Sequence, residues 1–233
     1  MKITYFSFLL FFCCSIFAQD QLTWLKENKI DSLYREDQFY IGFSFNFLND
    51  LPQDVDQSGF SGGLIFGFIR DMPINKRRNI SVGAGLGFNL NTFGQTLQIR
   101  NVAEGEEFTV LDSESNFDTN RFTTNLIEIP LELRWRSSDF GKYSFWRVHL
   151  GVNFGYVLSS KSVFEGPQES YDFNPIEAIN DFRTSLKLTF GYGAVNFLVD
   201  ASLNPLFDDA QIKSTGEKVT IRPIKVGLVF FLL

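Results

Sequence analysis

Several residue types are scarce in this sequence, and their scarcity excludes whole classes of site. Both cysteines, Cys13 and Cys14, lie close to the N-terminus. Once an N-terminal leader is removed, the chain has no thiol, and therefore no disulfide and no cysteine-ligated metal. Such a chain must be stabilised by backbone pairing and side-chain packing alone.

Long apolar runs and clustered positive charge are also missing. Beyond the N-terminal leader no apolar stretch of about 18 residues occurs, and the mean hydropathy of −0.03 is too polar for a helical membrane protein. The formal net charge is −6, from 21 Lys and Arg against 27 Asp and Glu. Because nucleic-acid binding needs a clustered basic surface, we expect no nucleic-acid partner.

What the sequence has instead is 28 phenylalanines and 18 glycines in 233 residues. Apolar residues recur at every second position, with glycine, serine or asparagine between them, as in residues 39–47. This alternation is typical of β-strands. A mean hydropathy near zero then follows, because half of the side chains face lipid and half face a polar interior.

The N-terminus has the pattern of a secretory signal peptide. Lys2 supplies a positive charge, an apolar run follows, and Ala18 is a small residue at the expected cleavage site. We therefore predict that residues 1–18 are a signal peptide. Bulky Phe12 stands where a small residue should precede a lipidated Cys13, which disfavours a lipoprotein.

The remaining chain divides into a short lead and one large domain. Residues 19–38 are polar with loosely helical apolar spacing, so a short periplasmic helix and a plain tether both fit. Residues 39–233 carry eight segments of alternating polarity, at 39–47, 60–68, 80–91, 127–136, 146–156, 182–190, 195–203 and 222–233. Their lengths suit tilted strands that cross a bilayer. We predict an all-β fold, an eight-stranded antiparallel transmembrane up-and-down β-barrel in the outer membrane.

The connections alternate between long and short, which sets the expected orientation. Long ones lie at 48–58, 92–124, 159–180 and 205–219, and short ones at 71–79, 137–142 and 191–194. With both chain ends on one side, we expect short periplasmic turns and long extracellular loops. The first short turn is a candidate contact for periplasmic partners through Asp71, Lys76, Arg77 and Arg78.

The longest connection, 92–124, carries a prediction of its own. Residues 95–99 and 108–111 have an extended pattern on either side of Glu104-Gly105-Glu106. We predict a hairpin that extends beyond the membrane with these three residues at its tip.

The last strand carries two further predictions. We expect its alternate residues to face lipid, namely Ile224, Val226, Leu228, Phe230 and Leu232. It should close the barrel by pairing with residues 39–47, because an unpaired apolar edge strand would aggregate. The pattern also resembles the closing-strand signal read by the outer-membrane assembly machinery, with Lys225, Gly227, Phe230 and Leu232 in the pattern positions and Leu232 in place of the usual aromatic.

Charged residues on the inward faces predict a lumen filled by ion pairs. They are Glu128, Glu132, Arg134, Arg147, His149, Lys187, Asp200 and Lys225. An eight-stranded barrel is only wide enough for its own side chains or one small ligand, and each buried charge needs a partner. Avoiding like charges directly opposite each other favours a register with Glu132 opposite Arg147. Asp200 is expected diagonal to Lys187.

No motif for catalysis or metal binding fits the sequence well. Residues 54–59 start like a calcium loop, but Ile65 stands where a bidentate glutamate is required. Glu128 and Glu132 are about 13 Å apart along a strand, beyond the roughly 5–9.5 Å of glycosidase carboxylate pairs. A catalytic role for His149 would need a serine and an acid that the sequence cannot place beside it. We expect no cofactor, no metal and no enzymatic activity.

Three segments, residues 67–79, 128–136 and 145–147, resemble the PorT-like outer-membrane barrel family, and the resemblance extends over residues 39–233. It implies an eight-stranded barrel associated with type IX secretion, which exports proteins and supports gliding. The first hypothesis is therefore a non-enzymatic secretion or gliding component, with membrane lipid, the barrel-assembly machinery and secretion proteins as partners. The alternatives are a small-solute channel or ligand-binding barrel, and a surface adhesin that acts through residues 92–124.

Overall fold

The computed structural model describes residues 37–111, 115–137 and 145–232, which lie within the compact unit Arg35–Leu233. The predicted signal peptide and most of the 19–38 segment fall outside the described residues. The described residues form eleven strands: β1 (Gln38–Asn49), β2 (Gly62–Pro73), β3 (Ile80–Gly94), β4 (Leu97–Val102), β5 (Gly105–Val110), β6 (Thr119–Arg136), β7 (Trp146–Glu165), β8 (Ser170–Phe173), β9 (Phe182–Tyr192), β10 (Val195–Ser202) and β11 (Arg222–Leu232). None of the described residues belongs to a helix long and apolar enough to span a membrane.

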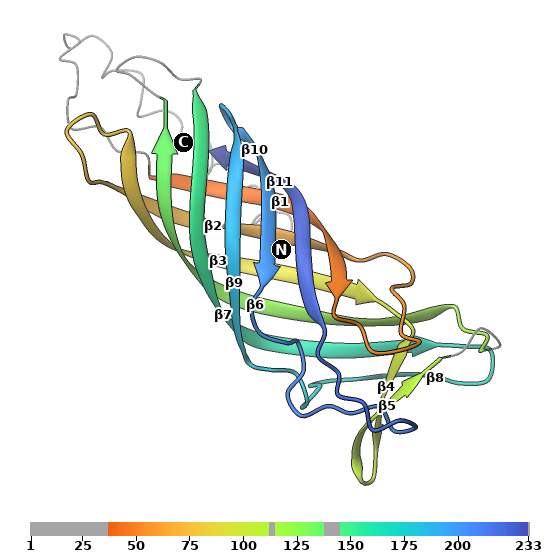
Figure 1. Ribbon diagram of the computed structural model, residues 1–233. Coiled ribbons are helices and arrows are strands. Elements are labelled where there is room, and N and C mark those ends of the chain that lie inside the picture. The colour runs from red at the N-terminus through yellow and green to blue at the C-terminus, as the bar shows by residue number, and fades with distance from the viewer. Residues whose placement is uncertain (1–36, 112–114, 138–144, 233) are drawn as a thin grey trace, which may run out of the picture. The chain divides into compact units, whose positions relative to one another are not determined.

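Eight of these strands close into a barrel (Figure 1). The order is β6-β3-β2-β1-β11-β10-β9-β7, and β7 pairs with β6 to complete the ring. All neighbouring strands in the ring are antiparallel. The predicted eight-stranded antiparallel barrel is confirmed. Closure pairs the backbone N–H and C=O groups of each strand on both sides, which a hydrocarbon environment requires.

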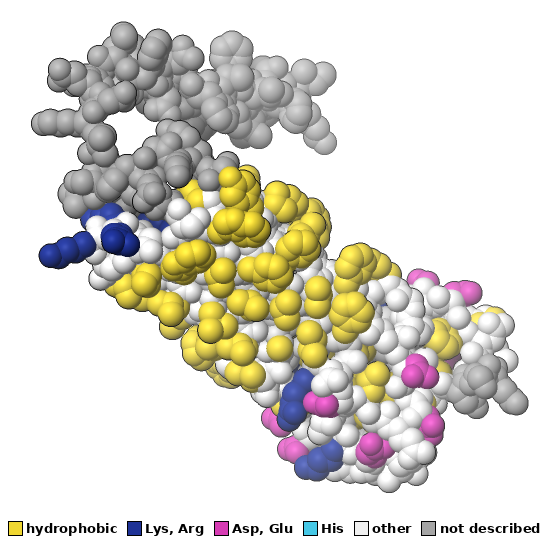
Figure 2. Space-filling model, turned by 45° about the horizontal axis from the view of Figure 1, so that its top comes forward, with side chains coloured by type: hydrophobic (Ala, Val, Ile, Leu, Met, Phe, Trp, Pro, Cys, Tyr) yellow, Lys and Arg dark blue, Asp and Glu magenta, His cyan; other side chains and the backbone are white. Residues whose placement is uncertain are grey.

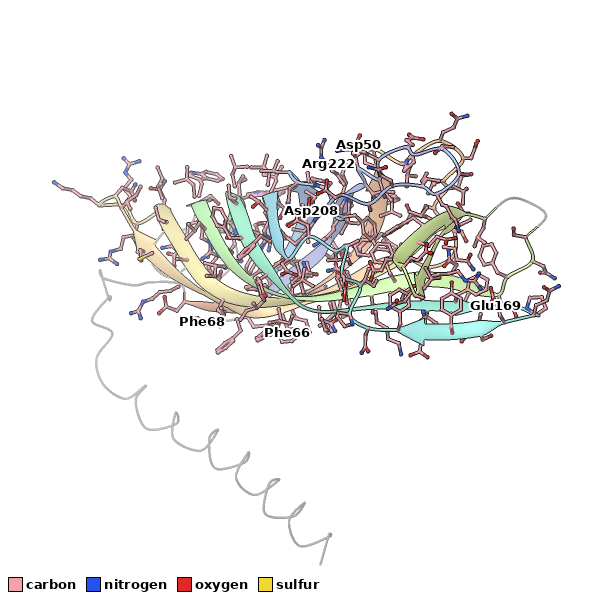
Figure 3. All side chains as sticks on the ribbon, turned by 90° about the horizontal axis from the view of Figure 1, so that it is seen from below. Asp50, Phe66, Phe68, Glu169, Asp208 and Arg222 are labelled. Carbon is pink, nitrogen blue, oxygen red and sulfur yellow. The ribbon has the colours of Figure 1, made fainter. Side chains whose placement is uncertain are left out.

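The alternation in the sequence becomes an inside and an outside. In β1 every second residue is buried and the others are exposed; the Phe43 and Phe45 side chains, for example, point outward. Figure 3 shows Phe66 and Phe68 of β2 projecting from the outer wall. In Figure 2 hydrophobic side chains cover much of the barrel surface, as a lipid-facing belt would.

The seam of the barrel lies between β1 and β11. Their register runs from Phe39 opposite Leu232 to Asn49 opposite Arg222. The prediction that the last strand pairs with the first is confirmed. The alternate β11 residues from Ile224 to Leu232 lie on the outer face, while Lys225 is buried in the lumen.

The predicted register between β6 and β7 is wrong. Glu132 lies opposite Gly151, and Arg147 lies opposite Arg136. Two like charges, Arg136 and Arg147, therefore lie directly opposite each other, which the predicted register was chosen to prevent. They are tolerated because each guanidinium is directed elsewhere: Arg136 donates to Asp71, and Arg147 donates to the Gly193 carbonyl and stacks 4.2 Å from the Phe145 ring centre.

The long connections pack together at one end of the barrel. We call residues 50–61, 95–111, 115–118, 166–181 and 203–221 the loop cap. β4 and β5 form the predicted hairpin, but its tip is wrong: Ala103 and Glu104 connect the strands, while Gly105 and Glu106 already pair within β5. β8 adds to the extended end of β7, and Figure 1 shows all three strands at the same end. Asp and Glu side chains gather on this end in Figure 2.

A hydrophobic core joins the loop cap to the barrel wall. Its buried loop residues include Leu97, Phe108, Ile176, Ile179, Phe207 and Ile212, and its wall residues are Leu48, Phe93, Phe122, Leu126 and Val157. The Phe122 ring stacks on Phe93 at 4.9 Å and meets Phe207 edge-on at 5.5 Å. Because these wall residues face inward, the core fills the mouth of the lumen. The loops are thus a packed structure and not free connections.

Substitution of Gly227 tests how closely β11 packs against β1 at the seam. A Cβ atom at this position would collide with the Phe43 carbonyl oxygen of β1. We expect Gly227→Ala to lower the unfolding free energy by roughly 2–3 kcal/mol, measured by urea unfolding of the refolded barrel. Gly155→Ala is the matched control, since its Cβ would meet nothing closer than Leu126 Cδ2 at 3.2 Å. Equal losses in the two variants would contradict the crowding at the seam.

Candidate functional site

Asp71 is the centre of a buried charge cluster near the short-turn end of the lumen. Its carboxylate accepts hydrogen bonds from Arg134 Nη1 at 3.1 Å, Arg136 Nη1 at 2.9 Å and Ser81 Oγ at 2.5 Å. The Gln38 side-chain oxygen accepts a further bond from Arg134. All of these side chains are buried. One carboxylate thus holds two guanidinium groups from β6.

Glu132 holds a second group of cations. Lys187 Nζ lies 3.0 Å from its carboxylate and Arg134 Nε lies 3.6 Å from it. His149 Nδ1 is 3.8 Å away, and the His149 ring packs edge-on against Phe231 at 5.2 Å. Arg134 therefore bridges Asp71 and Glu132, which joins the two clusters into one network across β2, β6, β7 and β9.

Glu128 and Asp200 lie closer to the loop cap and are held by amides and a hydroxyl. Asn89 Nδ2 donates to Glu128 at 2.9 Å, while Asn153 Nδ2 and Ser185 Oγ each donate to Asp200 at 3.0 Å. A cavity of about 20 Å³ lies among these residues. That volume has room for about one water molecule.

The structure changes the predicted pairing of Lys187. This residue lies directly opposite Asp200 and not diagonal to it, yet its ammonium binds Glu132 instead. Lys225 lies opposite Asp200 on the other side. Asp200 is thus flanked by a lysine from each neighbouring strand, which balances its charge without a close contact to Lys187.

The structure also changes the set of turn residues, predicted as Asp71, Lys76, Arg77 and Arg78, that a periplasmic partner could reach. Asp71 is buried, because β2 continues to Pro73 and its odd-numbered residues face inward. Lys76 and Arg77 are exposed in the turn. Arg78 accepts a hydrogen bond at its carbonyl from Arg136 Nε at 2.9 Å. The turn is therefore tied to the lumen network.

The four residues of the assembly-signal pattern lie along β11. Lys225 and Gly227 share the inward face, and Phe230 and Leu232 share the outward face. Through their register partners, Asn46, Ser44, Ile41 and Phe39, they follow the seam with β1.

One ion pair and a carboxylate that accepts backbone hydrogen bonds fasten the loop cap from outside its hydrophobic core. The Glu106 carboxylate of β5 accepts hydrogen bonds from the backbone N–H groups of Glu177 at 2.6 Å and Ala178 at 2.9 Å. Lys213 Nζ lies 2.6 Å from Glu107, and this hydrogen bond lowers the pKa of the Glu107 carboxyl. The β4–β5 hairpin is thus fixed to two other loops.

Sequence reasoning missed Asp71 and Arg136 as members of the lumen network. Parity along β2 and β6 would have found both, because Asp71 continues the inward row of Ile65 and Ile69, and Arg136 that of Arg134. The amide partners Asn89 and Asn153 also lie on inward rows. No local signal in the sequence connects them to Glu128 or Asp200.

The side chains of the lumen are suited to joining the strands across the interior. The carboxylates of the network are occupied by cations, amides or hydroxyls, and the only histidine of the sequence is buried against Phe231. Among the described residues, no group of three or more His, Cys, Asp or Glu side chains could hold a metal ion.

Asp71 should be the most sensitive residue of the network. Asp71→Asn leaves two buried guanidinium groups with reduced compensation, so we expect a loss of roughly 3–5 kcal/mol of unfolding free energy, measured by urea unfolding in detergent. The exposed pair of Asp50 and Arg222 at 3.2 Å provides the control. Asp50→Asn should cost less than about 1 kcal/mol. Similar losses at both positions would show that burial of the network is not what matters.

Comparison with protein-family models agrees with this architecture. Residues 17–208 match the family model described as outer membrane protein beta-barrel domain. No curated protein sequence gives a match. The chain is similar to Ail, the attachment invasion locus protein of Yersinia pestis, in its complex with the heparin analogue sucrose octasulfate. Identity is 11%, coverage is 86% of this chain and 100% of that chain, and the TM-score is 0.34.

A mutant porin of Rhodopseudomonas blastica is also similar, at 9% identity, with 85% of this chain and 100% of that chain covered and a TM-score of 0.21. The family match has more weight than either structure, because both structures have low sequence identity and low TM-scores. The chain therefore belongs to the outer membrane protein beta-barrel domain family.

Proposed function

We propose that this protein is a non-enzymatic outer-membrane barrel that serves type IX protein secretion or gliding as an accessory component. It acts through surfaces at its two ends and not by passing solute through its lumen. The observation that carries this proposal is the closed lumen. Its partners would be membrane lipid, the barrel-assembly machinery during insertion, and secretion proteins.

Two separate structures close the lumen. At the periplasmic half, buried ion pairs join the strands across the interior, with Arg134 held between Asp71 and Glu132. At the extracellular mouth, the hydrophobic core beneath the loop cap fills the opening. Opening a water-filled path would expose unpaired charges and apolar side chains together, both of which are costly. The small-solute channel is therefore the weaker hypothesis.

The periplasmic turn between β2 and β3 supports a docking role. Lys76 and Arg77 are exposed at its tip, and the turn is stiffened by a side-chain hydrogen bond of 2.5 Å from Asn75 to Asn79. A fixed pair of cations suits an acidic surface on a periplasmic partner. Residues 67–79 and 128–136, which resemble the PorT-like family, meet here through Asp71 and its two arginines.

A second candidate function, surface attachment, is favoured by the loop cap. Its hydrophobic core and the Glu106 clamp hold the loops in one arrangement, so a partner would meet a preorganised surface. Residues 101–104, which include the tip of the β4–β5 hairpin, are exposed and are the part of the cap that such a partner would meet first.

The refolded protein in a planar bilayer should show no steady open conductance, because both closures block the lumen. The measurement is single-channel current at moderate voltage. Matched recordings of Asp71→Asn, which weakens only the periplasmic network, should show at most brief openings because the cap remains in place. A stable open state of the unaltered protein would sink the proposal of a closed barrel and favour the channel hypothesis.

Deletion of the gene in its native host should deplete the secreted proteins, measured by mass spectrometry of the culture medium. Complementation with Lys76→Glu/Arg77→Glu should fail to restore secretion, because the turn then repels an acidic partner. Replacing residues 101–104 by glycine and serine should restore secretion and leave surface attachment as the only possible defect.

The two variants act as controls for each other, since each leaves the barrel wall intact and gel mobility verifies insertion. A normal set of secreted proteins in the deletion strain would count against the secretion role. Loss of attachment by the hairpin variant alone, together with normal secretion in the deletion strain, would establish the second candidate instead.

A further inference from the structure

The outer wall of the barrel has a groove of about 700 Å³ near the extracellular edge of the apolar belt. It crosses β11, β1, β2, β3 and β6 and is lined by Phe43, Phe45, Phe60, Leu64, Leu90 and Leu228 on its apolar side. Gly62 forms part of its floor, where the absence of a side chain leaves room under the Phe60 ring. The groove faces the lipid and not the lumen.

The strand register shows that one side of this groove is polar. In one row across the wall, Phe45 is opposite Gly62, Gly62 opposite Thr92, Thr92 opposite Thr123, and Thr123 opposite Lys161. Paired residues are about 5 Å apart. The row therefore changes from the apolar ring of Phe45 to two threonine hydroxyls and a lysine ammonium within a few strands. All of these residues are on the outward face.

The next row repeats the change from apolar to polar. Leu64 lies opposite Leu90, Leu90 opposite Asn125, and Asn125 opposite Ser159. Asn125 Nδ2 donates to Ser159 Oγ at 2.8 Å. In the described part of the chain the buried Thr92 Oγ1 atom has no hydrogen-bond partner. Because hydrocarbon cannot satisfy the Thr92 hydroxyl, an occupant that also carries hydrogen-bonding atoms fits the groove better than a purely apolar one.

Two cations stand at the polar side. Arg121 lies two residues beyond Thr123 on the same outward face of β6 and is exposed. Lys161 is partly exposed and pairs with Asp172 at 2.7 Å, a half-exposed contact that water screens. Along β6 the outward residues change from Ile127 to Asn125, which marks the edge of the apolar belt. Positive charge here is therefore at the level of lipid headgroups.

We propose that this groove binds a lipid with an anionic phosphate headgroup from the outer leaflet. An acyl chain lies against Phe43, Leu64 and Leu90, and the phosphate is held by Arg121 and Lys161 with hydrogen bonds from Thr123. A lipid has the same order of apolar and anionic parts along its length as the groove has along the wall. This inference is independent of the secretion and attachment roles.

Native mass spectrometry of the refolded mature chain in neutral detergent tests the proposal. The probes are dimyristoyl phosphatidylglycerol and dimyristoyl phosphatidylcholine, which differ in headgroup charge but not in acyl chains. We expect the anionic lipid to be retained roughly thirtyfold better, because each of two basic residues contributes about 1 kcal/mol at an anionic lipid surface. Arg121→Ala/Lys161→Ala should remove this preference. Leu90→Trp, which fills the groove, should lower retention of both lipids.

Arg100→Ala/Arg222→Ala is the matched control, because it removes the same charge at the same end of the barrel outside the groove. Equal loss of preference in both double variants would mean general electrostatic attraction and would overturn the site. Competition by millimolar inorganic phosphate would identify a free-anion site, and dimers without lipid would identify a second copy as the occupant; either result overturns the lipid assignment. Gel mobility with and without boiling verifies that each variant is folded.

Discussion

Backbone hydrogen bonding is the constraint on which the whole structure depends. A strand surrounded by hydrocarbon has no water to satisfy its N–H and C=O groups, so every edge in the membrane must be paired. The pairing of β1 with β11 completes that requirement. Once the ring is closed, the period of two along each strand places alternate residues in lipid and in the lumen, and the remaining features follow from that division.

The narrow interior determines what the inward side chains can do. Eight strands leave little space beyond the side chains themselves, so Arg134, Glu132 and Lys187 have to be neutralised by one another. Asp71 has the same role for Arg134 and Arg136. The result is a lumen filled by charges that neutralise one another. The proposed roles accordingly lie at the two ends and on the outer wall.

The sequence allowed the fold to be predicted well because its signals are local and repeated. Alternation locates the strands, loop lengths locate the ends, and the apolar last strand requires a partner. The partners of individual lumen residues could not be predicted in the same way. Glu132 was expected beside Arg147, yet the long β6–β7 ladder places Arg147 opposite Arg136, because the register of a whole strand pair outweighs one like-charge contact.

The sequence by itself determined the strand segments, the inward and outward faces, the strand that closes the ring and the hairpin in residues 92–124. Only the tertiary structure decided that Asp71 is buried, that the loops share one hydrophobic core, and that Phe45, Gly62, Thr92 and Lys161 stand in one row. The physical reason is range: the face that a side chain takes follows from the local two-residue repeat of an extended backbone, whereas these contacts join residues far apart in the chain. Their positions depend on the registers of all strands in the ring together.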